Sequence, residues 1–167
     1  NVHCSALPRV AVYHESDPSL TTPVRLYADA DRDLVALRSD VPVSPDAATQ
    51  VAGCLDTWFA EHDVLPVFLS GLGREKDDEA PALYGIATGD GADALDRADI
   101  DQPKEPGLVS GPTGAMLAES LERGRDAVGL VVESDPRFPD PEAARALLVH
   151  GIDPVAGTET PTDELVS

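Results

Sequence analysis

The sequence predicts an α/β fold in three layers, with a mixed β-sheet covered by helices on both faces. Apolar runs of strand length alternate along the chain with amphipathic segments of helical period, a pattern typical of such sheets. Residues 24–40 add a hairpin pattern, so we expect the sheet to be mixed rather than purely parallel. The 167 residues, 42% of them hydrophobic, suffice for one domain with a sizeable core.

The N-terminal part of the sequence predicts strands and turns. Residues 9–15 are apolar and β-branched, which favours a strand, and residues 16–23 form a turn-rich connector. Two strands are expected within residues 24–40, joined by the turn "ADADRD", whose aspartates can hydrogen-bond their own backbone. That turn resembles a calcium loop. It lacks the glycine and the distant glutamate of an EF-hand, so we expect no calcium site there.

A helix is predicted for residues 45–62. Ser44 is suited to cap its start, and Pro45 takes the first helical position. Apolar residues follow at helical spacing as far as Trp58 and Phe59, which indicates an amphipathic helix packed on a core. We expect these two aromatic side chains to lie in that core. Contact with a partner protein is the alternative.

The second half of the chain alternates strands and helices. Residues 64–72 form a short apolar run bounded by turns, which predicts a strand buried on both faces. Leu108 and Val109 are expected to end a strand, just before a helix that begins at Pro112 and stops at Gly124. The other predicted elements are a strand at residues 83–90, a helix at 92–99, a strand at 127–134 and a helix at 141–150.

The composition limits the classes of partner. The chain carries 31 acidic against 12 basic residues, a formal net charge of −19, and its only lysines are Lys76 and Lys104. An acidic surface on a patterned core indicates adaptation to molar intracellular salt, where screening acts within roughly 3 Å. We therefore expect no binding to nucleic acid, whose phosphate backbone repels so acidic a chain. No apolar run approaches the length of a membrane span.

The two cysteines lie far apart, in different motifs. Cys54 falls on the apolar side of the predicted helix, and we expect it to be a small core residue. Cys4 stands near the start of the chain. The sequence has no CxxC motif, and it lacks the framework of several cysteine pairs that would indicate secretion. We therefore expect a cytoplasmic protein.

The turn "SGPTG" is the first candidate for a ligand site. A turn of small residues before a helix exposes backbone N–H groups, which suit an anion. The turn has neither the lysine of a phosphate-binding loop nor the spacing of a nucleophile elbow. A tight corner that seats a helix on the sheet is the favoured interpretation, and a ligand site is the alternative. The residues of that ligand site would be Ser110, Gly111, Thr113 and Gly114, with Glu133 at the end of a strand.

The histidines give little support for catalysis or metal binding. His3, His14, His62 and His150 show no zinc-ligand spacing, so we expect no metal and no cofactor. A triad of Ser110 with His14 or His150 remains open, although nothing in the sequence requires one.

The C-terminal half resembles the proteasome assembly chaperone family, in its archaeal and bacterial single-domain branch. The resemblance rests on the glycine-rich turn, the strand motif "GRDAVGL", the acid Glu133 and the helix start "DPEAA" at residues 140–144. "LPRVAVY" near the start and "LYGIATGD" in the middle also fit, so the resemblance covers nearly the whole chain.

This resemblance implies a fold like that of purine nucleoside phosphorylases and related hydrolases. It also implies homo-oligomers and, in some members, binding to proteasome α-subunits during ring assembly. We therefore expect a non-enzymatic chaperone-like protein. The alternative is an enzyme of phosphorylase or hydrolase type, or of the ATP-grasp ligase type with which the family has been labelled, binding a small anion at the turn.

The chain is expected to be a single α/β domain over residues 1–167. It begins at Asn1 without a methionine and stops where a helix is expected to start. The resemblance implies a further strand, glycine-rich loop and helix before Asn1 and a helical tail after Ser167, so we expect a piece of a longer protein.

Overall fold

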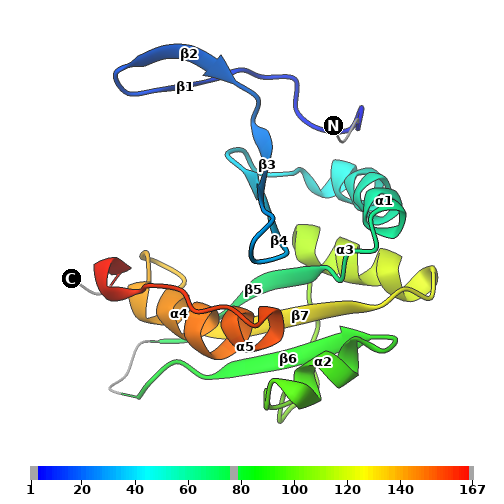
Figure 1. Ribbon diagram of the computed structural model, residues 1–167, viewed down its shortest axis with the longest axis vertical. Helices are drawn as coiled ribbons and strands as arrows, with labels where there is room; N and C mark the ends of the chain where they lie inside the picture. Colours follow the sequence, from blue (N-terminus) through cyan, green and yellow to red (C-terminus); the bar gives the residue numbers. More distant parts are fainter. Residues whose placement is uncertain (1–3, 76–78, 166–167) are drawn as a thin grey trace.

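A three-stranded mixed sheet forms the centre of the molecule. The computed structural model describes residues 4–75 and 79–165. The strand order is β5 (Val67–Gly73), β7 (Ala127–Ser134), β6 (Leu83–Thr88), with β5 parallel and β6 antiparallel to β7 (Figure 1). The sheet is mixed, as expected, but β6 makes it so. The predicted hairpin at residues 24–40 forms a sheet of its own.

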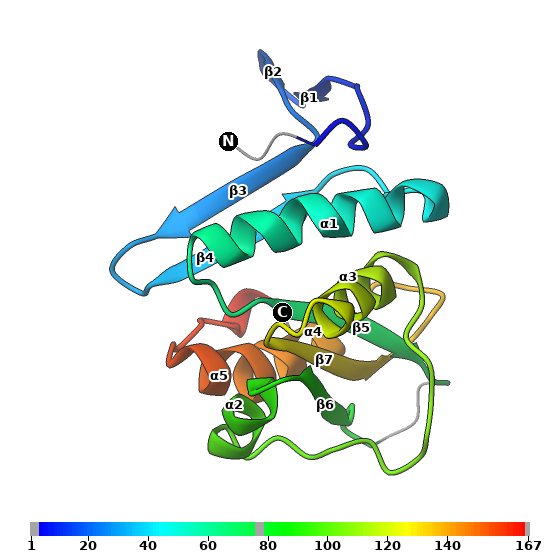
Figure 2. The same ribbon diagram turned by 90° about the vertical axis from the view of Figure 1, so that its right-hand side faces the viewer.

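Helices cover both faces of this sheet, which confirms the predicted α/β layering (Figure 2). Consecutive residues of β7 point to opposite faces. On one face a Cβ at Gly129 would meet Ile86 and then Leu117 of α3 (Gly111–Glu122). On the other face Leu130 lies against Gly151. The helices on that second face are α2 (Gly91–Arg97), α4 (Pro141–Ala146), the π-helical η1 (Leu147–Ile152) and α5 (Asp153–Ala156), with the 3-10 turn η2 (Asp163–Leu165) following.

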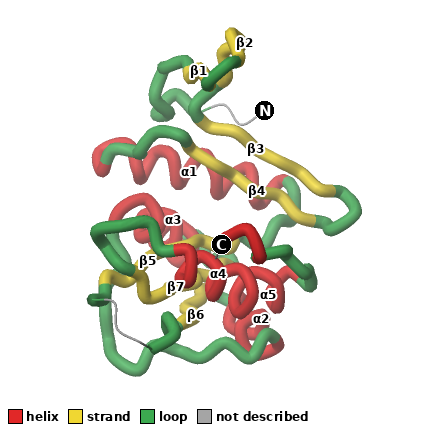
Figure 3. The backbone as a smooth tube through the Cα atoms, turned by 90° about the vertical axis from the view of Figure 1, so that its left-hand side faces the viewer, coloured by secondary structure: helices red, strands yellow, loops and turns green. Residues whose placement is uncertain are grey.

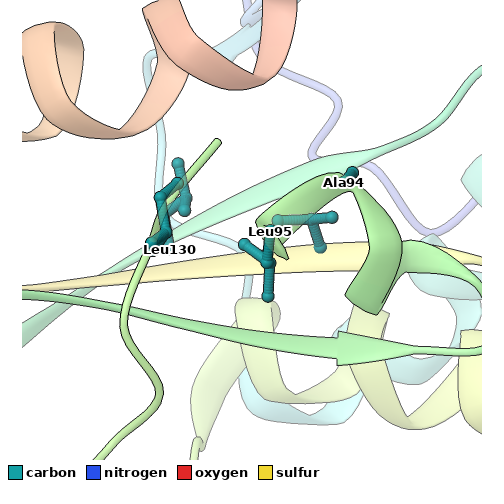
Figure 4. Close-up of a cluster of buried hydrophobic side chains, with 5 residues drawn as sticks. Ala94, Leu95 and Leu130 are labelled. Carbon is teal, nitrogen blue, oxygen red and sulfur yellow. The ribbon is translucent and has the colours of Figure 1, made fainter. Parts of the chain in front are cut away.

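The hydrophobic core lies between β7 and the helices of the second face. Val128 and Leu130 are fully buried there. Ala94 and Leu95 of α2 and Ile100 complete the cluster, which Figure 4 shows in close-up. Complete burial of one such aliphatic side chain contributes about 1.5–3 kcal/mol. The partly buried side chains around the cluster are Val67, Leu83, Ala98, Leu147, Ile152 and Val155.

Two predictions about the second half are wrong. Strand β5 is not buried on both faces, because it lies at an edge of the sheet, where Leu69 and Leu72 are exposed. An apolar run alone does not distinguish an edge strand from a central one. Leu108 and Val109 end no strand, since both lie in the irregular segment between α2 and α3.

Helix α1 (Pro45–Glu61) begins as predicted, with the Ser44 side chain accepting from the Ala47 N–H. It packs mainly on α3 (Figure 2). Trp58 and Phe59 are both half-buried; Phe59 contacts Phe68 of β5, and Trp58 stacks on His62.

The expectation for Cys54 requires correction. It forms a disulfide with Cys4, with 5.8 Å between the two Cα atoms, a normal separation for such a bond. The disulfide attaches the N-terminal segment to α1. Spacing in the sequence gave no sign of it, because the intervening chain returns to the helix only in three dimensions.

The N-terminal strands form two hairpins that stand apart from the central sheet (Figures 1 and 3). The first pairs β1 (Val12–His14) with β2 (Asp17–Thr21), so the predicted connector is partly a strand. The second pairs β3 (Val24–Asp29) with β4 (Leu34–Ser39), as predicted.

The turn between β3 and β4 is held by Asp29. Its carboxylate accepts from the Asp31 and Arg32 N–H groups and from the Arg32 side chain. The "ADADRD" segment therefore forms the expected turn, with the Asp29 carboxylate engaged by protein donors.

Candidate functional site

The "SGPTG" turn is a tight corner at the start of α3. Ser110 is the N-cap residue, exposed and without a side-chain capping bond. Gly111 has a φ of 68°, a left-handed conformation that favours glycine. At Gly114 the backbone passes so close to Val109 that a Cβ would lie 2.2 Å from the carbonyl oxygen. Both glycines are thus required by the local geometry of the corner.

Thr113 fixes this corner to the edge of the sheet. Its hydroxyl donates to the carbonyl oxygen of Leu69 in β5, over 2.9 Å. The Pro66 carbonyl, just before β5, accepts from a backbone N–H of β7, and the Arg74 N–H, just after β5, donates to a carbonyl of β7. Even-numbered residues along β5 therefore point their backbone groups toward β7. The odd-numbered Leu69 therefore presents its carbonyl to the outer edge, and Thr113 satisfies it.

Glu133 lies at the end of β7 and is held by protein donors. Its carboxylate accepts from the Arg74 side chain and, over 3.2 Å, from the Ala82 N–H. Its own N–H donates to the Ala82 carbonyl at 2.9 Å. The Arg74 guanidinium also pairs with Glu79. Glu133 thereby ties the end of β7 to the chain that follows β5 and to the chain that precedes β6.

A small cavity adjoins Glu133. Its volume of about 20 Å³ is enough for one water molecule, whereas sites for small ligands measure roughly 300 Å³ or more. None of the five turn residues lines it, so the structure does not bring the turn and Glu133 into one cavity. The assignment of both to a ligand site stays a prediction. The residues lining the cavity include Arg74, Glu79, Pro81, Glu133, Ser134 and Asp140.

The described histidines are placed far apart in the fold. His14 contacts Thr21 and Arg25 within the hairpin region, and His150 is exposed on η1. In the part of the chain that the structure describes, no hydrogen bond joins Ser110 to either, and no three potential metal ligands gather. His62 bonds the Trp58 carbonyl. His3 lies outside the described residues.

The sequence did not single out the apolar surface of the second hairpin. The antiparallel register places Leu26 opposite Leu37 and Ala28 opposite Val35, and directly opposed residues share a face. We call these four residues and Val24 the hairpin face. Alternation of apolar residues along both strands was the available signal. A sequence alone does not show whether a helix covers such a strand.

A comparison with family models identifies the relatives of this fold. The model described as the PAC2 family matches residues 1–167. The chain belongs to the PAC2 family. A relative by sequence, an uncharacterised protein from Methanocaldococcus jannaschii, is 29% identical over 126 residues, covering 75% of this chain and 51% of that protein. The chain thus spans about half the length of this curated relative.

Solved structures from Pyrococcus furiosus share the fold of this PAC2-family chain. PbaA, described as an archaeal homolog of proteasome-assembly chaperone, has a TM-score of 0.82 and 20% identity, over 97% of this chain and 66% of its own. PbaB, described as an archaeal proteasome activator, has a TM-score of 0.75 and 18% identity, over 96% and 72%. At such identities the likeness establishes the fold.

Within the described residues, no helix has the length and apolar character needed to cross a membrane.

Proposed function

We propose that this PAC2-family chain is a non-enzymatic, chaperone-like protein that binds other proteins, with proteasome α-subunits as the partner. The family match over residues 1–167 carries the proposal. The likeness to PbaA, whose description refers to proteasome assembly, supports the choice of partner. The phosphorylase-like character of the fold, the cytoplasmic location, the homo-oligomeric state and the adaptation to high salt belong to the same proposal.

Such a protein acts by differential binding. It holds a surface of an unassembled subunit and loses that contact when the neighbouring subunit arrives, so no bond chemistry is needed. The chain presents apolar side chains for this purpose at β5, where Leu69 and Leu72 are exposed. Apolar patches on an otherwise charged surface are typical of protein-binding sites.

The test mixes the chain with unassembled α-subunits of its own proteasome in molar potassium chloride. Size exclusion with light scattering then follows complex formation and the appearance of α-rings. We expect a complex of defined mass, or faster ring formation than with α-subunits alone. Two independent peaks at micromolar concentration, with unchanged ring formation, would refute the choice of partner.

The enzyme alternative rests on the open space around the start of α3. Ser110 is exposed there, and a Cβ added at Gly111 would have no neighbour within 4 Å. Titration calorimetry with inorganic phosphate and with a nucleoside tests it. Saturable binding that Ser110→Ala or Gly111→Val abolishes would favour the enzyme. An α-subunit complex that survives both substitutions favours the chaperone.

A further inference from the structure

We propose that the two N-terminal hairpins, with the hairpin face at their centre, form the surface through which two copies of this chain associate. The proposal deepens the homo-oligomeric part of the proposed function and is independent of proteasome α-subunits. It rests on three observations: where the exposed apolar side chains gather, how little supports the hairpins, and where the charge is lowest.

Exposed apolar side chains concentrate on the hairpins. Half of the 14 large apolar side chains that are exposed within the described residues lie between positions 10 and 37. Tyr13 is 80% exposed, and Leu26 and Leu37, opposite each other, are about 40% exposed. An apolar concentration of this kind marks a surface that another protein covers. Leu26, Val35 and Leu37 belong to the hairpin face, whereas Tyr27 lies on the opposite face of β3. The other three are Val10, Tyr13 and Leu20.

The hairpins have little support from the rest of the molecule. Each is a two-stranded sheet with no strand pairing to the central sheet, and the β1–β2 hairpin stands away from that sheet in all three views (Figures 1 to 3). An isolated two-stranded hairpin is marginally stable in water and needs a third strand or a packed face. A partner that covers the hairpin face would supply this packing.

The charge distribution identifies that partner as a second copy. Residues 9–40 carry four arginines against six carboxylates, whereas the rest of the chain has eight basic against 25 acidic residues. Two copies with a net charge of −19 repel each other over most of their surface. The hairpins are the near-neutral region where they meet with least repulsion. A two-fold contact also matches an apolar face with an apolar face, since each copy contributes the same patch.

The dimensions suit an interface in which both hairpins take part. Six-residue strands are about 20 Å long, so one face of the β3–β4 pair is much smaller than the ~800 Å² per partner of a stable interface. The β1–β2 hairpin adds two further exposed apolar side chains, Tyr13 and Leu20. We therefore place the contact on both hairpins.

The first test compares two Leu→Asp variants. Leu37→Asp puts a carboxylate at the centre of the hairpin face, whereas Leu121→Asp puts one on α3, at a side chain that is 68% exposed. Light scattering in molar potassium chloride should give an oligomer for the parent chain and for Leu121→Asp. Leu37→Asp should weaken association about tenfold or more, since burying an unpaired charge is costly. A monomeric parent chain, or an unchanged oligomer in Leu37→Asp, overturns the proposal.

A second test does not depend on disrupting the fold. Both native cysteines are bonded to each other, so a cysteine added at Leu37 or at Leu121 is the only free thiol among the described residues. A bismaleimide should join two copies through Leu37→Cys and give a product of twice the monomer mass. Efficient joining through Leu121→Cys, and none through Leu37→Cys, would contradict the proposed surface.

Salt and α-subunits separate the remaining outcomes. Raising potassium chloride from low to molar concentration should strengthen association, because it screens acidic repulsion and favours apolar burial. Dissociation at molar salt would overturn the proposal.

Leu37→Asp is also mixed with α-subunits. If the parent chain self-associates but neither protein binds α-subunits, the proposed partner fails and the hairpin interface stands. If Leu37→Asp loses only α-subunit binding, the hairpins bind α-subunits and the self-association surface is refuted.

Discussion

The central sheet and the N-terminal hairpins differ in how far the apolar side chains of their strands are covered. In the sheet, β7 is covered on both faces, so Val128 and Leu130 are fully buried. In the hairpin, β3 and β4 pair in perfect register, yet Leu26 and Leu37 remain partly exposed. Strand pairing alone therefore does not create a core. Helices packed on the strands do, and their absence leaves a surface available for binding.

The comparison implies that stability resides in the sheet and its helices. Helix α1 packs on α3 and buries Ala48, Val51, Ala52 and Leu55 there. The N-terminal segment that carries the hairpins is joined to α1 by the Cys4–Cys54 disulfide. Substitutions in the central sheet should therefore lower the free energy of unfolding more than substitutions in the hairpins.

The largest expected effect is in the core. Leu130→Ala leaves a cavity between β7 and η1, which should lower the free energy of unfolding by about 4 kcal/mol. In the separate chain, Leu37→Ala removes the same atoms from a side chain that is 40% exposed, so it should cost about 1 kcal/mol or less at protein concentrations too low for association. Urea unfolding followed by circular dichroism measures both. Equal losses would show that the hairpin is as well packed as the sheet, contrary to the comparison.

Removing the disulfide should have the next largest effect. The bond closes a loop of 50 residues that contains both hairpins, so Cys4→Ser should lower the free energy of unfolding by about 3 kcal/mol. Thermal unfolding with and without a reducing dithiol measures the loss. Cys54→Ser and the double variant serve as controls, because all three remove one bond and should lose the same amount. A double variant that loses twice as much would show that the thiols act separately.

The third effect concerns the ion pairs that join α1 to the body. The carboxylate of Asp56, which is 4% exposed, accepts from the Arg125 side chain at 2.7 Å, and Arg123 lies 3.5 Å from the same oxygen. Asp56→Ala should cost about 2 kcal/mol, because both guanidinium groups lose a shielded partner.

A matched control for Asp56 comes from the hairpin turn. Arg32→Ala breaks the exposed pair with Asp29 and should cost at most about 0.5 kcal/mol. Denaturant midpoints in low and in molar salt compare the two variants. If both losses vanish in molar salt, the Asp56 pair is an ordinary surface pair and does not attach α1.

Local signals in the sequence predicted the parts of the fold that local chemistry decides. Ser44 and Pro45 placed the start of α1, and the strand propensity of residues 127–134 placed β7. The sequence did not reveal that β5 is an edge strand or that Cys4 reaches Cys54, because both depend on which distant segments lie beside them. For the candidate site, the tight corner at Gly114 was predictable from its small residues. That Arg74 engages Glu133 was not, since the two are 59 positions apart.

The smallest expected effect is a pH dependence at Asp153, the residue that begins α5. Burial raises the pKa of this carboxyl group, but hydrogen bonds from Thr158 and Thr160 outweigh it, and the net pKa lies below its usual value of 3.8. A lowered pKa contributes stability that is present above pH ~4 and is lost as the pH falls through the folded-state value. Asp153→Asn should therefore cost about 1 kcal/mol near neutral pH and progressively less in acid.

Asp29 in the hairpin turn is the comparison for this prediction. Its pKa is also lowered, chiefly by a hydrogen bond from the charged Arg32 side chain. The donors at Asp153 are neutral hydroxyl and backbone groups, whereas the chief donor at Asp29 is a charged, exposed side chain whose interaction salt screens. Urea unfolding of Asp153→Asn and Asp29→Asn is followed as the pH falls below about 5, in low and in molar salt. The pH dependence removed by Asp153→Asn should persist in molar salt, and that removed by Asp29→Asn should fade. If both pH dependences fade to the same extent in molar salt, the Asp153 carboxylate is no better shielded from salt than the Asp29 carboxylate.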